Sequence, residues 1–244
     1  MELKNIFKME LYKNSNDKQY LFVIAVLAIM AALVTFFGIA AIEGNFNQSF
    51  ETALLFYPLL VFTFMGLGVF SLLYPFHLLN VDYKNKVMSL VFASGVGREK
   101  YYFVKVSATI ITCLIATLVI MFIPSVTFLV VYRDEFTMAM RFFIEGFSVV
   151  DIAPFVLSSI FGLLLNIVIL TTSVIITKGK VTGIFLYFLF LFVTSSISNA
   201  FVRPFKFAYY ENISNMFYMS VVSSIICICI FTLIGLYVLR KQDL

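Results

Sequence analysis

The sequence predicts an all-α, polytopic membrane protein with six transmembrane helices, both termini in the cytoplasm and a single domain over residues 1–244. Three observations predict this class: 62% of the 244 residues are hydrophobic, only 12% are charged, and the mean hydropathy is +1.03. A water-soluble core cannot bury so large an apolar fraction. We therefore expect the lipid bilayer to be the solvent for most of the chain.

Six apolar stretches are long enough to cross a bilayer, because a transmembrane helix needs about 20 such residues. They cover residues 20–42, 52–79, 107–132, 154–177, 181–198 and 216–238. The second stretch is longer than a bilayer requires and contains two prolines and two glycines, so we expect it to tilt or kink. Pro124 predicts a kink in the third stretch.

The basic residues predict the orientation of these spans. Thirteen of the seventeen Lys and Arg residues lie before the first span, between the second and third, between the fourth and fifth, or after the sixth. The positive-inside rule places these segments, and both termini, in the cytoplasm. Residues 1–18 also place apolar side chains beside lysines on one face of a helix, which predicts an amphipathic helix in the cytoplasmic interface. The apolar side chains are Leu3, Ile6, Phe7 and Leu11.

The predicted spans carry no Asp, Glu, Lys or Arg away from their ends, and one histidine, His77, near the cytoplasmic end of the second. Ion-coupled carriers and intramembrane hydrolases need ionisable or nucleophilic groups there, so both classes are disfavoured. The sequence also lacks a glycine-rich phosphate loop, a metal-ligand spacing around its cysteines, and a basic patch suited to nucleic acid. We expect no enzyme, no catalytic residue, no metal site and no cofactor bound by this chain.

Residues 80–105 interrupt the apolar chain between the second and third spans. Val87, Leu90 and Val91 recur at helical spacing, which predicts a short amphipathic helix. Ser94 opens a turn with two glycines that ends this helix, and Arg98 starts the chain back towards the membrane. The residues predict a compact basic elbow below the bilayer. A plain topogenic loop with interfacial side chains fits the same pattern.

This elbow resembles the first cytoplasmic loop of ABC-2 type permeases. In that family an acidic residue precedes a helix, a turn ends in a basic residue, and a lysine further along opens the next span. Asp82, Arg98 and Lys105 match these positions by order and spacing. Val96 and Gly97 stand where a proline and a small hydroxyl residue are usual just before the basic residue.

The resemblance implies that the elbow is a coupling helix moved by a dimer of cytoplasmic ABC ATPase subunits, which would bind ATP and Mg. The expected ATPase-coupling residues are Asp82, Lys84, Leu90, Ser94, Arg98 and Lys100. A second permease subunit, either identical or a sister chain, would complete the transporter in a bacterial plasma membrane. The short turn at residues 178–180 is either a second lever or a plain tight connection.

Polar side chains inside the spans either line a transport pathway or pack the helices together. The candidates are Asn166, Thr171, Thr172 and Ser195. Thirty Phe and ten Met residues favour bulky, adaptable apolar surfaces. Within the family, the chain most resembles the small permease subunits of Gram-positive exporters of phenol-soluble modulins and antimicrobial peptides, which implies an amphipathic peptide as cargo. The alternatives are a non-transporting membrane subunit for binding, regulation or peptide immunity, and an ion channel.

Overall fold

A computed structural model describes residues 3–43, 49–131, 152–206 and 213–242 of the chain. Every element in this part is an α-helix, which confirms the predicted all-α class. The helices are α1 (Leu3–Ser15), α2 (Lys18–Glu43), α3 (Ser49–Lys84), α4 (Val87–Ala93), α5 (Arg98–Val131), α7 (Ile152–Thr177), α8 (Thr182–Lys206) and α9 (Ile213–Lys241).

Five helices of the described part, α2, α5, α7, α8 and α9, are long and apolar enough to cross a membrane. This agrees with a multi-pass membrane protein. The remaining predicted span, the second, at residues 52–79, lies within the 36 residues of α3, and its crossing of the bilayer stays a prediction. In α8 the helix continues to Lys206, well beyond the predicted end of the span at residue 198. Backbone hydrogen bonding extends a helix past the point where its side chains become polar.

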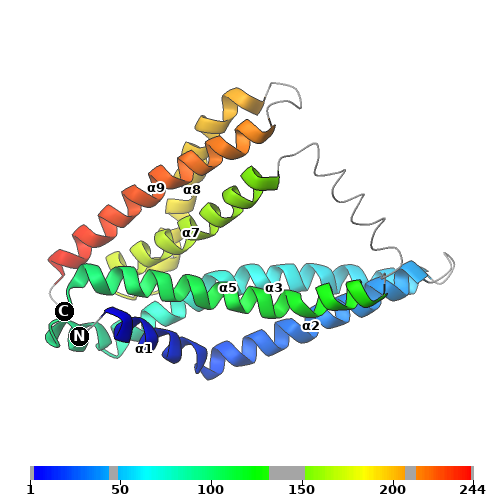
Figure 1. Cartoon of the computed structure of the whole chain (residues 1–244), viewed down its shortest axis with the longest axis horizontal. Coiled ribbons are helices and arrows are strands. Elements are labelled where there is room, and N and C mark those ends of the chain that lie inside the picture. Colours follow the sequence, from blue (N-terminus) through cyan, green and yellow to red (C-terminus); the bar gives the residue numbers. More distant parts are fainter. Residues whose placement is uncertain (1–2, 44–48, 132–151, 207–212, 243–244) are drawn as a thin grey trace.

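The long helices form two groups that diverge from one end of the molecule (Figure 1). One group holds α2, α3 and α5, and the other holds α7, α8 and α9. Successive long helices run in opposite directions, which brings α1, residues 80–105, the α7–α8 turn and the end of α9 together. We call this the elbow end. The sequence assigns these same segments to the cytoplasm.

An apolar cluster holds the first group together. Tyr20 and Leu27 of α2 pack with Phe70 and Tyr74 of α3 and with Ala116 of α5. The rings of Tyr20 and Tyr74 are stacked, with their centroids 4.6 Å apart. The buried side chains of α2, among them Tyr20, Leu27 and Ala31, form a narrow inner stripe, while apolar side chains such as Phe22 and Ile29 are exposed on the rest of the helix.

The centre of the second group is α7. Its residues 167–175 are buried without a break, as expected for a helix that is apolar on all sides. The same cluster includes Leu79 of α3 and Tyr102 of α5, so it also joins the two groups near the elbow end. By contrast, Phe185 and Phe192 of α8 are about three-quarters exposed, at 74% and 75%. Such rings are stable on a surface covered by lipid chains.

The predicted short helix of the elbow is α4. It ends where the backbone N–H of Ser94 donates to the carbonyl of Leu90 at 3.1 Å and that of Gly95 to the carbonyl of Phe92 at 3.0 Å. Gly95 has a φ of 85°, in the left-handed region that favours glycine. Gly97, the other glycine of the predicted turn, has no such φ. One glycine is therefore enough to reverse the chain here.

Candidate functional site

A cluster of four charged side chains lies inside the elbow end. Glu10 and Lys13 come from α1, Asp82 from the end of α3, and Lys105 from the first turns of α5. The ammonium of Lys105 donates to Glu10 Oε2 at 2.7 Å and also pairs with Asp82, which in turn pairs with Lys13. The hydroxyl of Tyr101 donates to Asp82 Oδ2 at 3.0 Å. We call these four charged residues the ionic cluster.

The ionic cluster is charge-balanced and largely dry. Glu10, Asp82 and Lys105 are each at most 1% exposed. Removing such groups from water costs several kcal/mol per ion, which only close pairing and hydrogen bonding offset. Burial by itself would raise the pKa of Asp82, but the charges of Lys105 and then Lys13 outweigh it and hold this pKa below its ordinary value. Asp82 is therefore ionised at neutral pH, and the cluster joins three helices.

The cluster changes the expectation for the N-terminal helix. The sequence predicts that the apolar stripe of residues 1–18 faces the membrane interface, but Ile6 of that stripe packs inside the protein against Met88, Val96 and Tyr101. Glu10, which interrupts the stripe in the sequence, points into the ionic cluster and is fully buried. One face of α1 therefore rests on α4 and α5 rather than on lipid, because its carboxylate finds a buried cation there.

The last turn of α9 is tied to the elbow. Arg98 donates through Nη1 to the carbonyl of Leu239 at 2.9 Å and to that of Arg240. The final carbonyls of a helix have no partner within the helix, so the guanidinium caps this end. Arg240 also pairs with the exposed carboxylate of Glu99. The hydroxyl of Tyr83 donates to Gln242 Oε1 at 3.1 Å. The elbow and the end of α9 thus form one assembly.

The predicted coupling residues occupy two different positions. Lys84, Leu90, Ser94 and Lys100 are exposed at the elbow end, with Leu90 at 68%. Asp82 is fully buried and Arg98 is half-buried against α9. Asp82 therefore lies beneath the elbow surface and Arg98 lies at its junction with α9, and the coupling role of both residues stays a prediction. They position the exposed residues, since a buried carboxylate needs a cation and a helix end needs a donor.

The predicted pathway residues also separate. Asn166 is exposed and lines a cavity of about 510 Å³ between the two helix groups, opposite Phe70 and Cys113. Thr171 and Thr172 are buried away from it. Their hydroxyls donate to carbonyls, that of Thr171 to Ile167 at 2.7 Å and that of Thr172 to Phe231 at 3.0 Å.

The bond of Thr172 crosses to α9 and fits the packing role that the sequence left open, whereas the bond of Thr171 stays within α7. Ser195 is exposed on α8 and is not among the residues that line the cavity. Of the four candidates, only Asn166 lies where two helix groups face one another across a space.

Sequence reasoning did not single out Glu10, Lys13 or Tyr101 as site residues. Glu10 and Lys13 lie three residues apart on one helix face, and a carboxylate inside an otherwise apolar stripe is the signal that points to a buried partner. The sequence does not show which cation is the partner, because Lys105 is 95 residues away.

Comparisons with protein-family models, curated proteins and solved structures find no match for this chain.

Proposed function

We propose that the chain is the permease subunit of an ATP-driven exporter of amphipathic peptides, and that a separate ATPase moves it through the elbow. The observation that supports this most is the construction of the elbow end. Three helices meet there around the ionic cluster, and α9 is capped onto the same assembly. A force applied to such an assembly moves several membrane helices together rather than bending a loose loop.

The exposed surface of α4 supports the same proposal. Leu90 is 68% exposed next to the exposed Lys84 and Lys86, at an end of the molecule to which the positive-inside rule assigns cytoplasm. A large apolar side chain surrounded by cations in water is typical of a protein contact, in which an apolar anchor is buried inside a polar rim. The ATPase subunits are the proposed partner, and they bring ATP and Mg.

The cavity beside Asn166 is the proposed start of the cargo route. It lies between the two helix groups, so a change in the angle between the groups would change its shape. Its walls are mainly apolar, with polar groups from Thr117, Ser159, Asn166 and Tyr187, which suits an amphipathic segment better than an ion or a sugar. A second permease subunit would enclose the side of the route that this chain leaves open.

The test is co-purification with the ATPase and measurement of peptide export. Leu90→Ala removes the proposed anchor, and we expect at least a tenfold loss of ATPase binding and of export, with normal insertion of the permease. Tyr237→Ala is the matched control, because Tyr237 is 59% exposed near the same end but lies on α9. Equal ATPase binding and export in both variants and the parent chain would contradict the proposal and favour the non-transporting membrane subunit.

A further inference from the structure

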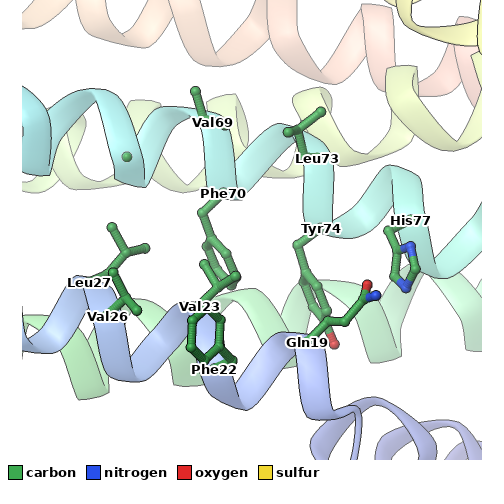
Figure 2. Close-up of a pocket in the computed structure, with 11 residues that line it drawn as sticks. Gln19, Phe22, Val23, Val26, Leu27, Val69, Phe70, Leu73, Tyr74 and His77 are labelled. Atoms are coloured by element: carbon green, nitrogen blue, oxygen red, sulfur yellow. The ribbon is translucent and has the colours of Figure 1, made fainter.

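A groove of about 470 Å³ runs between α2 and α3, away from the ionic cluster (Figure 2), and shares one lining residue, Phe70, with the cavity at Asn166. Its volume lies within the range of about 300–1,000 Å³ found for small-molecule sites. Phe22 and Val26 of α2 stand at its rim and are 69% and 39% exposed. Phe70 and Tyr74 of α3 are buried and form its floor. The groove therefore opens sideways, onto the surface of two apolar helices.

The floor of the groove offers no hydrogen-bonding group along its length. The rings of Phe70 and Tyr74 stack with their centroids 5.3 Å apart. The hydroxyl of Tyr74 is directed into the protein and donates to the carbonyl of Asn14 at 3.2 Å. An extended peptide would bring backbone N–H and C=O groups that find no partner here, at a cost of several kcal/mol each. A hydrocarbon chain carries no such groups.

Polar side chains gather at one end of the groove. Gln19 of α2 and His77 of α3 lie there side by side (Figure 2). His77 Nε2 is 3.7 Å from Asp17 Oδ2. This is the elbow end, at which the predicted spans of α2 and α3 reach the membrane surface. The groove thus matches a molecule with a long apolar tail and a polar head at the level of the lipid headgroups.

We propose that the groove binds one acyl chain of a bilayer phospholipid, with the headgroup next to Gln19 and His77. The opening at Phe22 and Val26 faces the bilayer if α2 spans it, so phospholipid is the apolar molecule in greatest excess at the site. A bound chain fills the space between two helices that otherwise touch along a single stripe. The lipid thereby becomes part of the packing of the first helix group.

The absence of tryptophan from the sequence makes this site directly measurable. Phe22→Trp places a fluorescent ring at the rim, and Leu21→Trp is the matched control. Leu21 is 52% exposed, does not line the groove, and lies only about 1.5 Å away along the axis of α2. The full-length variants are purified in detergent and titrated with a phospholipid that carries brominated acyl chains, which quench the ring on contact.

We expect quenching of Phe22→Trp to saturate near one phospholipid per chain and to be reversed by the same phospholipid without bromine. Quenching of Leu21→Trp should rise slowly without saturation. Identical curves for the two variants would mean bulk lipid only and would overturn the proposal. If a fatty acid reverses the quenching but excess phospholipid does not, the occupant of the groove is a free amphiphile. If the signal depends on protein concentration rather than on lipid concentration, the occupant is a second copy of the chain. Either result also overturns it.

The position of the headgroup has its own test. Replacing Gln19 and His77 together by leucine removes the polar end and leaves the floor intact. We expect the lipid concentration for half-maximal quenching of Phe22→Trp to rise about threefold to tenfold, the loss of one or two hydrogen bonds. An unchanged concentration would show that the headgroup does not bind at this end.

Discussion

Lys105 is the residue on which the ionic cluster depends, because its ammonium contacts both buried carboxylates. Without it, Glu10 loses its cation and Asp82 keeps only Lys13, which is 34% exposed. Buried charges left without a partner are among the most destabilising features that one substitution creates.

Lys105→Met should destabilise the protein by about 3–5 kcal/mol, or lower its unfolding temperature by about 10 °C. Methionine keeps the length of the stem but leaves two carboxylates in a dry site. Thermal unfolding of the purified protein in detergent measures the loss. Lys100→Met is the control, since Lys100 is exposed, and it should stay within about 0.5 kcal/mol. Equal losses in the two variants would show that the cluster contributes nothing to stability.

Asp82 makes the stability depend on pH. Its pKa is lower in the folded protein than in the unfolded chain, so its contribution is fully present above the unfolded pKa and is lost as the pH falls through the folded value. We expect the unfolding temperature of the parent protein to fall on acidification below about pH 4. The Asp82→Asn variant should be less stable than the parent protein at pH 7, and its unfolding temperature should fall less between pH 7 and pH 3. Parallel pH profiles for the two proteins would contradict this.

Among the elements, the turn of residues 178–181 between α7 and α8 is packed closely against its neighbours. Gly179 has a φ of 73°, and a Cβ atom built there would lie 2.8 Å from Cβ of Tyr83 and 3.0 Å from Oδ1 of Asn80. The turn therefore packs closely against the last turn of α3. A plain surface connection would leave room for a side chain, so the turn is packed against the end of α3.

Gly179→Ala should destabilise the protein by about 1–3 kcal/mol, because alanine is strained at this φ and meets Tyr83. Gly97→Ala is the matched control: a Cβ atom there has no neighbour within 4 Å, and its φ is not positive. Unfolding temperatures of the two variants measure the difference. A loss as large for Gly97→Ala as for Gly179→Ala would mean that the contact with α3 is unimportant.

For the molecule as a whole, the alternating directions of α2, α3, α5, α7, α8 and α9 place the elbow and the start of α9 at opposite ends (Figure 1). If all these helices cross the bilayer, the two ends lie on opposite sides of the membrane. The basic residues assign the elbow end to the cytoplasm.

Labelling of single cysteines tests this topology. In a chain whose three native cysteines are replaced by serine, Ser94→Cys and Asn215→Cys are treated with a reagent that does not cross membranes. We expect Asn215→Cys to react in intact cells and Ser94→Cys to react only after the cells are opened, because the reagent reaches the exposed side of the bilayer alone. Reaction of both positions from the same side would disprove the six-span arrangement.

The sequence by itself determined the helical class and the position of the long helices. Runs of about 20 apolar residues can satisfy their backbone in a bilayer only as helices, and this requirement is local. The short helix of the elbow and its glycine turn were also predicted correctly, because helical spacing and a turn glycine are local signals too. Among the site residues, the spacing placed Leu90 on the apolar stripe of this helix, but it did not predict that Leu90 is exposed.

Only the tertiary structure decided which charges meet and which polar groups face a space. Glu10, Asp82 and Lys105 come from three helices, and their pairing depends on how those helices pack, which no local pattern encodes. Thr172 and Asn166 are both polar residues within the same apolar stretch of the sequence. The hydroxyl of Thr172 donates to a carbonyl of α9, whereas the side chain of Asn166 lines a cavity. Hydrophobicity is a property of each segment, whereas an ion pair or a cavity is a property of the arrangement of several segments.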